Sequence, residues 1–396
     1  MPVAEALARV LDGVRSSDPE SVRLTDVLGR TLAAPLKAKL TQPPFDASAM
    51  DGYAVRAADI AELPATLTLI GVAAAGRAYA GTLQAGQAVR IFTGAPVPDG
   101  TDAIVIQEDS RAEADQVTIL APATPGGNIR PMGQDFLAGD TLLAPGLRLS
   151  ARHILLAAAS GHAMLSVRKK PTVALLANGD ELVEPGTPLG PGQIVSSNTY
   201  GLAALIEAAG GTPLLLGIAR DTREDLAAKI ATAKDADILV TIGGASVGDH
   251  DLVRPALEAS GATLDFTKIA MRPGKPMFSG RLGVTRILGL PGNPVSALVT
   301  ARVFLVPLIA ALLGRDDTGT TIDAILSQPL PANGPRDHYM RASLDTSSVP
   351  PRVTPLPSQD SSLVSALAAA GCLIIVPANA PAHAEGARVS VLPLDF

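Results

Sequence analysis

The sequence predicts a multidomain α/β protein whose largest unit is a three-layer, mostly parallel α/β domain. From residue 171 to 316, apolar strand-like runs alternate with helix-like segments, which is typical of a parallel sheet covered on both faces. Short β-like runs precede this region, and a Pro-rich, strand-like segment follows it. At 396 residues the chain is long enough for roughly two to four domains.

The first part of the chain predicts a helical and extended domain interrupted by a small β domain. Residues 1–34 carry apolar side chains at helical spacing with a break near residues 16–19, and residues 35–44 favour an extended connector. We expect the elongated helical and extended domain, with the dimer contacts, at 1–45 and 140–170, and the inserted mostly-β domain at 46–139. The supporting elements are β-like runs at 66–72, 88–93, 103–107 and 117–120 and a helix at 151–159.

The α/β domain is expected at 171–316 and a separate C-terminal β-rich domain at 317–396, with one helix near 361–370. Asn198 is the expected N-cap of one helix, and Asn293 with Pro294 is expected to start another. The apolar stretch 295–313 contains Arg302 and Pro307, which favours a core helix over a membrane span. The expected strands are 172–176, 213–218, 238–242 and 287–290, and the expected helices are 199–209, 223–233, 251–259 and the one from Pro294.

Composition excludes several classes of function. The formal charge is -6, from 32 basic and 38 acidic residues, which does not favour binding to nucleic acid or to a membrane surface. The chain has no Trp to stack on bases. Its one cysteine, Cys372, excludes a disulfide framework and is expected to be a small buried residue. With no signal peptide in the sequence, we expect a cytoplasmic protein.

Acidic residues follow three of the predicted strands. Asp180 and Glu181 come after the first strand, Asp221 after the second, and Asp249 and Asp251 after the third. Carboxyl ends of parallel strands meet at one sheet edge, where ligands bind, and converging carboxylates need a cation or solvent. Magnesium accepts one or two carboxylates plus substrate phosphates. For any single residue of this set, helix capping is about as good an explanation as metal binding. The position of the whole set at one sheet edge favours a metal site.

A basic turn follows at Arg272-Pro273-Gly274-Lys275-Pro276. The prolines stiffen the turn, so the Lys275 ammonium would meet an oxyanion at a lower ordering cost. A solvated basic loop is the alternative. No acidic residue interrupts the basic cluster, which consists of Lys268, Arg272, Lys275 and Arg281.

Two glycine turns complete the candidate site. Gly243-Gly244 and Gly292 allow backbone amides to approach an anion closely, although an ordinary tight turn explains each of them alone. The P-loop pattern is absent from the sequence. The histidines are scattered and show no metal-ligand spacing. The combination predicts a site for an anionic ligand that carries a metal ion.

Taken together, the motifs resemble the molybdopterin molybdenumtransferase family of the MoeA type, which is also represented by the E domain of gephyrin. The resemblance covers essentially the whole chain. The motifs that carry it are SAMDGYAV at 48–55, IFTGAPVP at 91–98, NIR at 128–130, GQD at 133–135, GDE at 179–181, GGASVGDHD at 243–251, PGKP at 273–276 and GLPGNPVS at 289–296.

The resemblance implies insertion of molybdate into molybdopterin, with adenylylated molybdopterin as substrate and AMP as product. It also implies an elongated homodimer with a site shared between subunits. One subunit would supply Asp51, Thr93 and Asp135. The partner would supply catalytic Glu181, Asp221, Asp251 and Lys275, with Mg²⁺ held by Glu181, Asp221 and Asp251. The implied substrate contacts are Gly243, Gly244, Ser246, Arg272, Pro291, Gly292, Asn293, Pro294, Ser296, Arg341 and Ser361 or Ser362.

Two other functions fit parts of this pattern. A sister family shares the α/β sheet but adenylylates molybdopterin with ATP; the β insert and C-terminal domain argue against it. A scaffolding role like that of gephyrin is disfavoured because the chain has no long linker and no second α/β domain. The molybdopterin adenylyltransferase and molybdoenzymes are the implied partners. Three questions stay open: whether Asp249 or Asp251 is the metal ligand, which metal is bound, and whether the anion is molybdate or tungstate.

Overall fold

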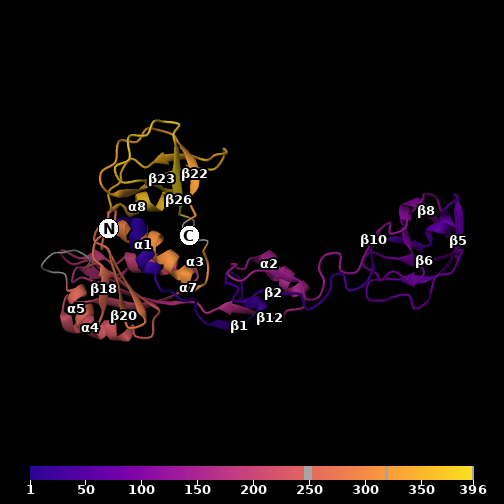
Figure 1. Cartoon of the computed structure of the whole chain (residues 1–396), viewed down its shortest axis with the longest axis horizontal. Helices are drawn as coiled ribbons and strands as arrows, with labels where there is room; N and C mark the ends of the chain where they lie inside the picture. The colour runs from indigo at the N-terminus through magenta and orange to yellow at the C-terminus, as the bar shows by residue number, and fades with distance from the viewer. Residues whose placement is uncertain (245–251, 317–319, 395–396) are drawn as a thin grey trace.

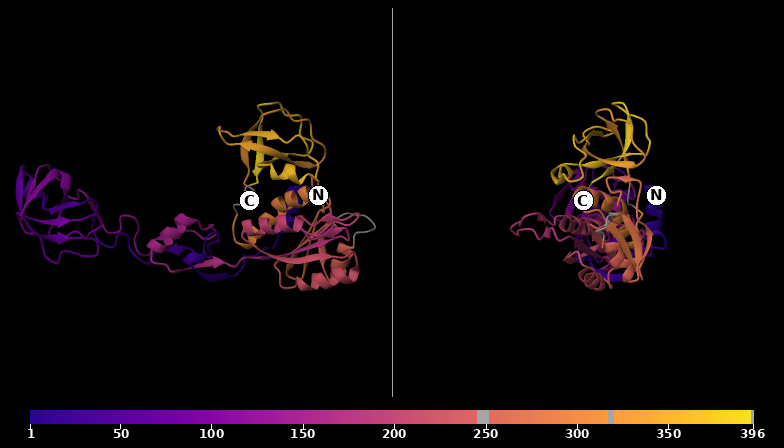
Figure 2. Two further views of the ribbon diagram at one scale, coloured as in Figure 1. Left: turned by 180° about the vertical axis from the view of Figure 1, so that it is seen from behind. Right: turned by 90° about the vertical axis from the view of Figure 1, so that its left-hand side faces the viewer.

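The molecule is elongated, with a β domain at one end and the α/β and C-terminal domains at the other (Figure 1). This computed structural model describes residues 1–244, 252–316 and 320–394. A narrow neck joins the two ends, and the view from behind shows the same linear arrangement (Figure 2). The chain passes through the neck twice, because the β domain is inserted between two neck segments.

The α/β domain is built on a six-stranded sheet in the order β16-β13-β17-β21-β20-β18. The first four strands are parallel, and β20 and β18 form an antiparallel edge. This confirms the predicted mostly parallel sheet. The strands are β13 (Thr172–Asn178), β16 (Thr212–Ala219), β17 (Ile238–Ile242), β18 (Thr263–Phe266), β20 (Phe278–Leu282) and β21 (Thr285–Leu290).

Helices cover both faces of this sheet. Every residue of β17 is buried, as its unbroken Ile-Leu-Val-Thr-Ile run requires of a strand with no solvent face. One core joins the sheet to α1 (Val3–Leu11), α3 (Asn198–Ala209) and the helices after Pro294, and the other joins it to α4 (Arg223–Thr232) and α5 (Val253–Ala259). From β13 the chain crosses first to β16 and then back to β17. The carboxyl ends of β13 and β17 therefore flank a topological switch point, which is where α/β sheets bind ligands.

The apolar run after Pro294 forms a core helix, as predicted. It consists of α6 (Pro294–Thr300), a π-helical segment η4 (Ala301–Leu305) and α7 (Val306–Leu312). Pro307 cannot donate a backbone hydrogen bond, and the wider π-helical turn lies directly before it. Among the described residues this is the one helical run long and apolar enough to cross a membrane, and 83% of it is buried inside the protein.

The first segment departs from the helical prediction for 1–34. Only α1 is an α-helix there; Gly13 follows it with φ +60°, and Pro19 begins a strand. Residues before proline are disfavoured in the helical region, which explains the break. The neck contains β1 (Pro19–Arg23), the 3₁₀ turn η1 (Leu24–Asp26), β2 (Leu36–Lys37), β11 (Thr141–Leu143), α2 (Ala151–Ala159) and β12 (Met164–Arg168).

The inserted β domain is a six-stranded sheet in the order β7-β4-β6-β5-β9-β8. The sequence missed β4, whose Gly-Tyr-Ala-Val reads as part of a turn motif, and β8, whose residues are polar. The strands are β4 (Gly52–Val55), β5 (Ala65–Ala73), β6 (Gln87–Ile91), β7 (Ala103–Ile106), β8 (Ser110–Glu113) and β9 (Gln116–Ile119), with 3₁₀ turns η2 (Ala57–Ile60) and η3 (Gln107–Asp109). At its base, β3 (Ala47–Ser48) pairs with β10 (Ile129–Arg130).

The C-terminal sheet closes on itself, because β23 pairs with both β24 and β25. A short strand of the α/β domain, β19 (Met271–Arg272), joins this sheet by pairing with β23. The predicted helix is shorter than expected and is α8 (Val364–Ala368). The strands are β22 (Ile322–Leu326), β23 (Asp337–Asp345), β24 (Arg352–Pro355), β25 (Cys372–Val376) and β26 (Arg388–Pro393).

Candidate functional site

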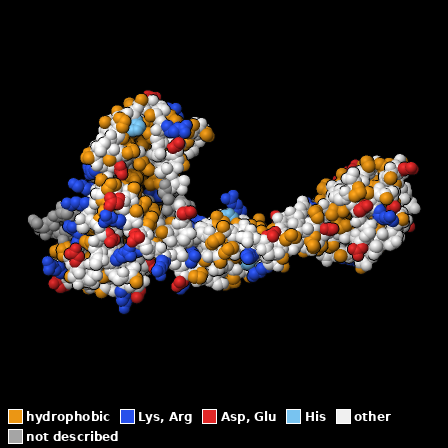
Figure 3. Space-filling model, viewed as in Figure 1, with side chains coloured by type: hydrophobic (Ala, Val, Ile, Leu, Met, Phe, Trp, Pro, Cys, Tyr) orange, Lys and Arg blue, Asp and Glu red, His pale blue; other side chains and the backbone are white. Residues whose placement is uncertain are grey.

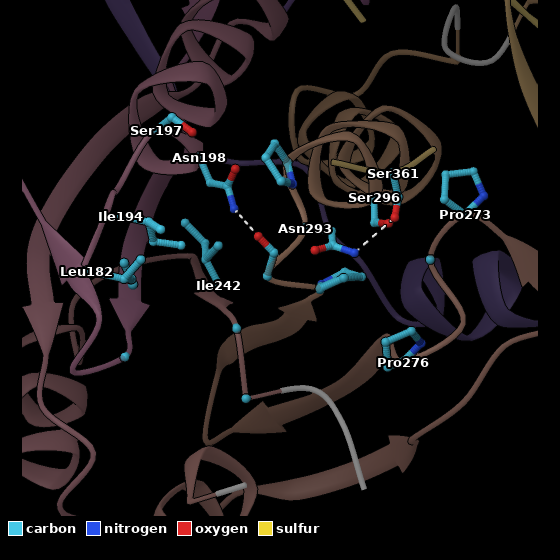
Figure 4. Close-up of a pocket in the computed structure, with 18 of the residues that line it drawn as sticks. Leu182, Ile194, Ser197, Asn198, Ile242, Pro273, Pro276, Asn293, Ser296 and Ser361 are labelled. Carbon is cyan, nitrogen blue, oxygen red and sulfur yellow. Dashed lines mark hydrogen bonds between the residues drawn. The ribbon is translucent and has the colours of Figure 1, made fainter. Parts of the chain in front are cut away.

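A cleft of about 860 Å³ lies at the carboxyl ends of the parallel strands, between the α/β and C-terminal domains. The turns after β13, β17 and β21 line it, together with the basic turn after β19 and the loop 359–361. Figure 4 shows Leu182, Ile194 and Ile242 on one side, Pro273 and Pro276 on the other, and Asn293 between them. The strand-end turns singled out in the sequence therefore line one cleft.

Two of the predicted carboxylates line this cleft. Glu181 folds back over Gly179, which has φ +145° and where a Cβ atom would collide with the Glu181 carboxylate. Asp221 does not cap α4; Thr222 takes that role and accepts a hydrogen bond from the Asp225 amide at 3.3 Å. The Asp221 carboxylate accepts one from the Asp180 amide at 3.4 Å and remains at the cleft.

The third predicted metal ligand, Asp251, lies outside the described residues, as do Asp249 and Ser246. Within the described ranges, no group of three or more His, Cys, Asp or Glu side chains converges. Glu181 and Asp221 are therefore the two predicted ligands whose positions the structure gives. Two carboxylates suit Mg²⁺, which completes its coordination with waters and substrate phosphates.

The basic side of the cleft contains Arg272, Lys275 and Arg336. Arg336 was missed by the sequence analysis, although it stands directly before β23, the strand that pairs with β19 beside the basic turn. Arg281 does not belong to this cluster, because its guanidinium donates to the Asp12 carbonyl oxygen at 3.0 Å. Lys268 is also not among the lining residues.

Arg341 does not reach the cleft, which corrects the predicted substrate contact. Its side chain is only 1% exposed. It donates to the carbonyl oxygens of Ser358 (3.2 Å), Asp360 (2.8 Å) and Leu363 (3.3 Å). Arg341 therefore holds the loop 358–363 in place, and the loop rather than the guanidinium faces the cleft.

Ser361 connects this loop to the Pro291-Gly292-Asn293-Pro294 turn. Its hydroxyl accepts a hydrogen bond from the Asn293 amide at 2.9 Å, and its carbonyl oxygen accepts one from the Val295 amide at 3.2 Å (Figure 4). Asn293 occupies the N-cap position of α6, but its side chain does not cap the helix. The turn and the C-terminal loop thus form one continuous wall.

The glycine turns lie against each other at the floor of the cleft. Gly243 and Gly244 have φ +91° and +61°, which side chains disfavour, so these positions need glycine. A Cβ atom at Gly292 would lie 3.6 Å from the Gly243 Cα atom. Asn198, expected as a helix cap, is the first residue of α3 and donates to the Gly292 carbonyl oxygen at 2.6 Å. Pro291, Pro294 and Ser296 complete this part of the lining.

One wall of the cleft is apolar and was not predicted. Leu182 lies on β14 (Leu182–Val183) and Ile194 on the paired β15 (Ile194–Val195), and both line the cleft with Ile242 (Figure 4). Their sequence context is a Pro- and Gly-rich loop with no periodic pattern, so only the structure reveals the wall. A ligand with one apolar face and several anionic groups matches such a cleft.

A buried histidine lies behind the basic turn. His338 pairs in register with Arg272 across the β19–β23 ladder and is 7% exposed. Burial, followed by the charges of Arg272, Arg336 and Arg341, lowers the pKa of His338 to about 4. The imidazole is therefore neutral near pH 7 and adds no positive charge to the cleft.

The remaining predicted residues lie in the inserted β domain, at the opposite end of the elongated molecule from the cleft (Figure 1). The Asp51 carboxylate accepts hydrogen bonds from the Thr93 amide and hydroxyl, each at 2.7 Å. These bonds, the amide first, lower the pKa of Asp51. Asp135 lines a separate cavity at the base of the insert. One chain therefore does not bring these three residues to the cleft.

Family models match nearly the whole chain. The MoeA N-terminal region (domain I and II) matches residues 1–161, a probable molybdopterin-binding domain matches 174–311, and the MoeA C-terminal region (domain IV) matches 323–394.

Individual proteins agree with these matches. The molybdopterin molybdenumtransferase of a Nostoc species is 41% identical over 83% of this chain and 77% of its own length. That of Bacillus subtilis is 35% identical over 99% of this chain and 94% of its own. A crystal structure of a molybdopterin biosynthesis MoeA protein from Pyrococcus horikoshii superposes with a TM-score of 0.87 at 31% identity, covering 100% of this chain and 99% of that one.

Proposed function

The chain belongs to the molybdopterin molybdenumtransferase family, and from that premise we propose that its cleft inserts molybdenum into molybdopterin. The substrates are molybdate and adenylylated molybdopterin, and the products are the molybdenum cofactor and AMP. The observation that carries the proposal is the cleft itself, which is lined by three acidic residues (Glu181, Asp221 and Asp360), three cationic residues and an apolar wall. The chain is accordingly a transferase of molybdenum cofactor biosynthesis.

The cationic side binds molybdate. Lys275, Arg272 and Arg336 supply positive charge, and the Ser296 and Ser361 hydroxyl groups supply short-range donors beside them. The loop held by Arg341 and the turn held by the Asn293–Ser361 hydrogen bond keep these donors in place before the anion arrives. Such preorganisation reduces the ordering cost of binding and places the anion for attack by the dithiolene sulfurs.

The carboxylate side suits a divalent metal bound to the pyrophosphate of the second substrate. Glu181 and Asp221 would hold Mg²⁺, with Asp251 proposed as a third ligand. When bound, the metal supplies charge neutralisation and Lewis-acid activation of the phosphoryl oxygen atoms. Because both side chains are anionic, they would act on the pyrophosphate through the cation that they hold. The apolar wall at Leu182, Ile194 and Ile242 covers the uncharged part of the ligand.

We also propose that the working form is a homodimer. The neck carries exposed apolar side chains, including Leu28 (67% exposed) and Leu155 (72% exposed) (Figure 3). Large apolar residues exposed in number mark interaction surfaces. A second copy packed on the neck would bring its Asp51, Thr93 and Asp135 to the cleft of the first. Cytoplasmic location, and the molybdopterin adenylyltransferase and molybdoenzymes as partners, belong to the same proposal.

The decisive experiment measures AMP release from adenylylated molybdopterin with and without molybdate and Mg²⁺. We expect release to require molybdate and to fall by roughly two orders of magnitude or more in Lys275→Ala, Glu181→Gln and Asp221→Asn, since each loses a charged contact to substrate or metal. Asp251→Ala should also block release while the fold survives. Arg281→Ala, whose guanidinium binds the Asp12 carbonyl oxygen, is the matched control. ATP consumption without the adenylylated pterin would instead support the adenylylation reaction and contradict the proposal.

A further inference from the structure

Arg90, in the sheet of the inserted domain, contacts both sides of the Asp51–Thr93 pair. Asp51 stands directly before β4, and Thr93 follows two residues after β6. The two strands are antiparallel with Gly52 opposite Ile91, so Asp51 and Thr93 leave the sheet at the same end. Their relative position therefore depends on how these two strand ends are joined.

On the Asp51 side, the Arg90 guanidinium donates two hydrogen bonds. One goes to the carbonyl oxygen of Gly52 at 3.3 Å, and the other goes to the side-chain oxygen of Gln107 at 2.6 Å. The Gln107 backbone amide in turn donates to the Asp51 carbonyl oxygen at 3.1 Å. Two successive carbonyl groups, those of Asp51 and Gly52, are therefore held by Arg90 directly or through Gln107.

On the Thr93 side, the contact of Arg90 is with an aromatic ring. Its guanidinium carbon lies 4.9 Å from the centre of the Phe92 ring and 4.9 Å from that of the Tyr53 ring. Both distances are within the limit of about 6 Å at which a cation and a ring attract each other. Phe92 directly precedes Thr93, so this contact restricts the backbone that carries Thr93. A planar guanidinium can stack and donate in its plane at once, which a lysine ammonium cannot do.

The charge of Arg90 also acts on Asp51. Its two hydrogen-bond acceptors are neutral groups, so these bonds do not neutralise the guanidinium. The hydrogen bonds from Thr93, followed by the Arg90 charge, lower the pKa of Asp51. Both Thr93 bonds end on the same carboxylate oxygen, Oδ1, and the other oxygen takes no part in them.

We propose that Arg90 is a positioning residue, which sets the geometry of Asp51 and Thr93 without itself contacting substrate. Its importance for the reaction rests on the proposed function, in which these two residues reach the cleft of a second copy. A displacement of about 1 Å at such a site reduces the rate by roughly a hundredfold. An arginine that only stabilises the sheet is the alternative, and it predicts no change at the Asp51 carboxylate.

The first test is a carboxyl NMR titration of Asp51 in Arg90→Lys and Arg90→Met. The lysine variant keeps the charge but loses the planar fork. Because Arg90 acts by position, the Thr93 hydrogen bonds should weaken in both variants, and the Asp51 pKa should rise toward its ordinary value in both. The control Arg111→Met changes an exposed arginine of β8 and should leave the pKa unchanged. An unmoved Asp51 pKa in Arg90→Lys would overturn the inference.

The second test is molybdate-dependent AMP release. At saturating substrates the rate should fall roughly tenfold or more in Arg90→Lys, with a smaller change in the molybdate concentration for half-maximal release, because the cationic side of the cleft is intact. Gln107→Leu removes one acceptor at an exposed position. It should keep the wild-type melting temperature and lose activity in the same direction by a smaller factor. Wild-type rates in both variants would contradict the proposed role of Arg90.

Mixed dimers separate this inference from the proposed function. Random dimers of Arg90→Lys with Lys275→Ala contain one intact site in each mixed pair, so AMP release should recover to roughly a quarter of the wild-type rate. Arg90→Lys mixed with Asp51→Asn should not recover, because both defects lie in the insert. Asp51→Asn mixed with Lys275→Ala reports the shared site itself. Recovery in that mixture alone overturns the inference. Recovery in neither mixture with Lys275→Ala, or no AMP release by the wild-type protein, removes the proposed function, and the Asp51 titration then decides the role of Arg90.

Discussion

Replacing Arg341 with methionine should weaken molybdate binding although the guanidinium never reaches the cleft. Methionine replaces the aliphatic part of the buried side chain but not the guanidinium, so the change removes three hydrogen bonds while most of the apolar packing remains. Their acceptors are the carbonyl oxygens of Ser358, Asp360 and Leu363. Water can replace part of each bond because the loop borders the cleft.

The expected loss of molybdate affinity follows from the three lost hydrogen bonds. At about 1 kcal/mol net for each of three bonds, the ordered loop loses about 3 kcal/mol, which lowers the ratio of ordered to open loop by roughly a hundredfold. Only the ordered loop places the Ser361 hydroxyl against Asn293. The molybdate concentration for half-maximal AMP release should therefore rise by roughly one to two orders of magnitude, with a smaller change in the rate at saturating molybdate.

Two further measurements separate positioning from direct contact. Arg341→Lys keeps one charged donor and should recover part of the affinity. Amide hydrogen exchange at 358–363 should accelerate in Arg341→Met, because the loop opens more often. Arg388→Met changes an exposed arginine of the same domain that pairs with Asp323, and should alter neither quantity. Weakened molybdate binding with unchanged exchange at 358–363 would refute the reasoning.

Three other predictions test groups in different parts of the molecule. The pKa of His338 falls from 6.5 to about 4 on folding. The stability that comes from its neutral imidazole is therefore complete above pH 6.5, and the free energy of unfolding drops by up to about 3 kcal/mol as the pH falls to 4. Urea unfolding followed by circular dichroism should show a shallower pH dependence in His338→Gln, and identical profiles would contradict this. Burial raises the pKa of the Cys372 thiol to about 11, so native protein should not react with a thiol-specific disulfide reagent near pH 8 until denatured, whereas rapid native reaction would show an accessible thiol. Thr93→Val removes one of the two hydrogen bonds that Asp51 accepts, so the Asp51 pKa should rise toward its ordinary value in a carboxyl NMR titration, and an unmoved pKa would count against the observed geometry.

The sequence predicted the α/β sheet and the place of the cleft because both depend on local patterns. Continuous apolar runs such as Ile238–Ile242 must be buried on both faces, and the turns that follow such strands meet at one sheet edge. The predicted break at 16–19 comes earlier in the structure, because the helix ends at Leu11 before Gly13, and the helical prediction for 20–34 failed because a strand begins at Pro19.

Side-chain roles were harder to predict than strand positions. Arg341 and Arg336 are five residues apart, and only the three-dimensional arrangement shows which one is buried against carbonyl oxygens and which lines the cleft. Asn293 and Asn198 were assigned to helix ends from propensity, yet tertiary partners hold both of their amides. The apolar wall at Leu182 and Ile194 has no periodic signal, so no sequence argument reaches it.

The pairing of β19 with β23 makes the C-terminal barrel a thermodynamic component of the cleft. The backbone of Arg272, which begins the basic turn, is hydrogen-bonded into a sheet that otherwise belongs to another domain. A substitution in the barrel core, for example at the fully buried Ala342, would lower the fraction of molecules with a competent turn. Apparent affinity for the anion scales with that fraction. An affinity assay would then record such variants as binding defects although they lie far from any ligand. A saturating concentration of the anion would restore their stability by mass action.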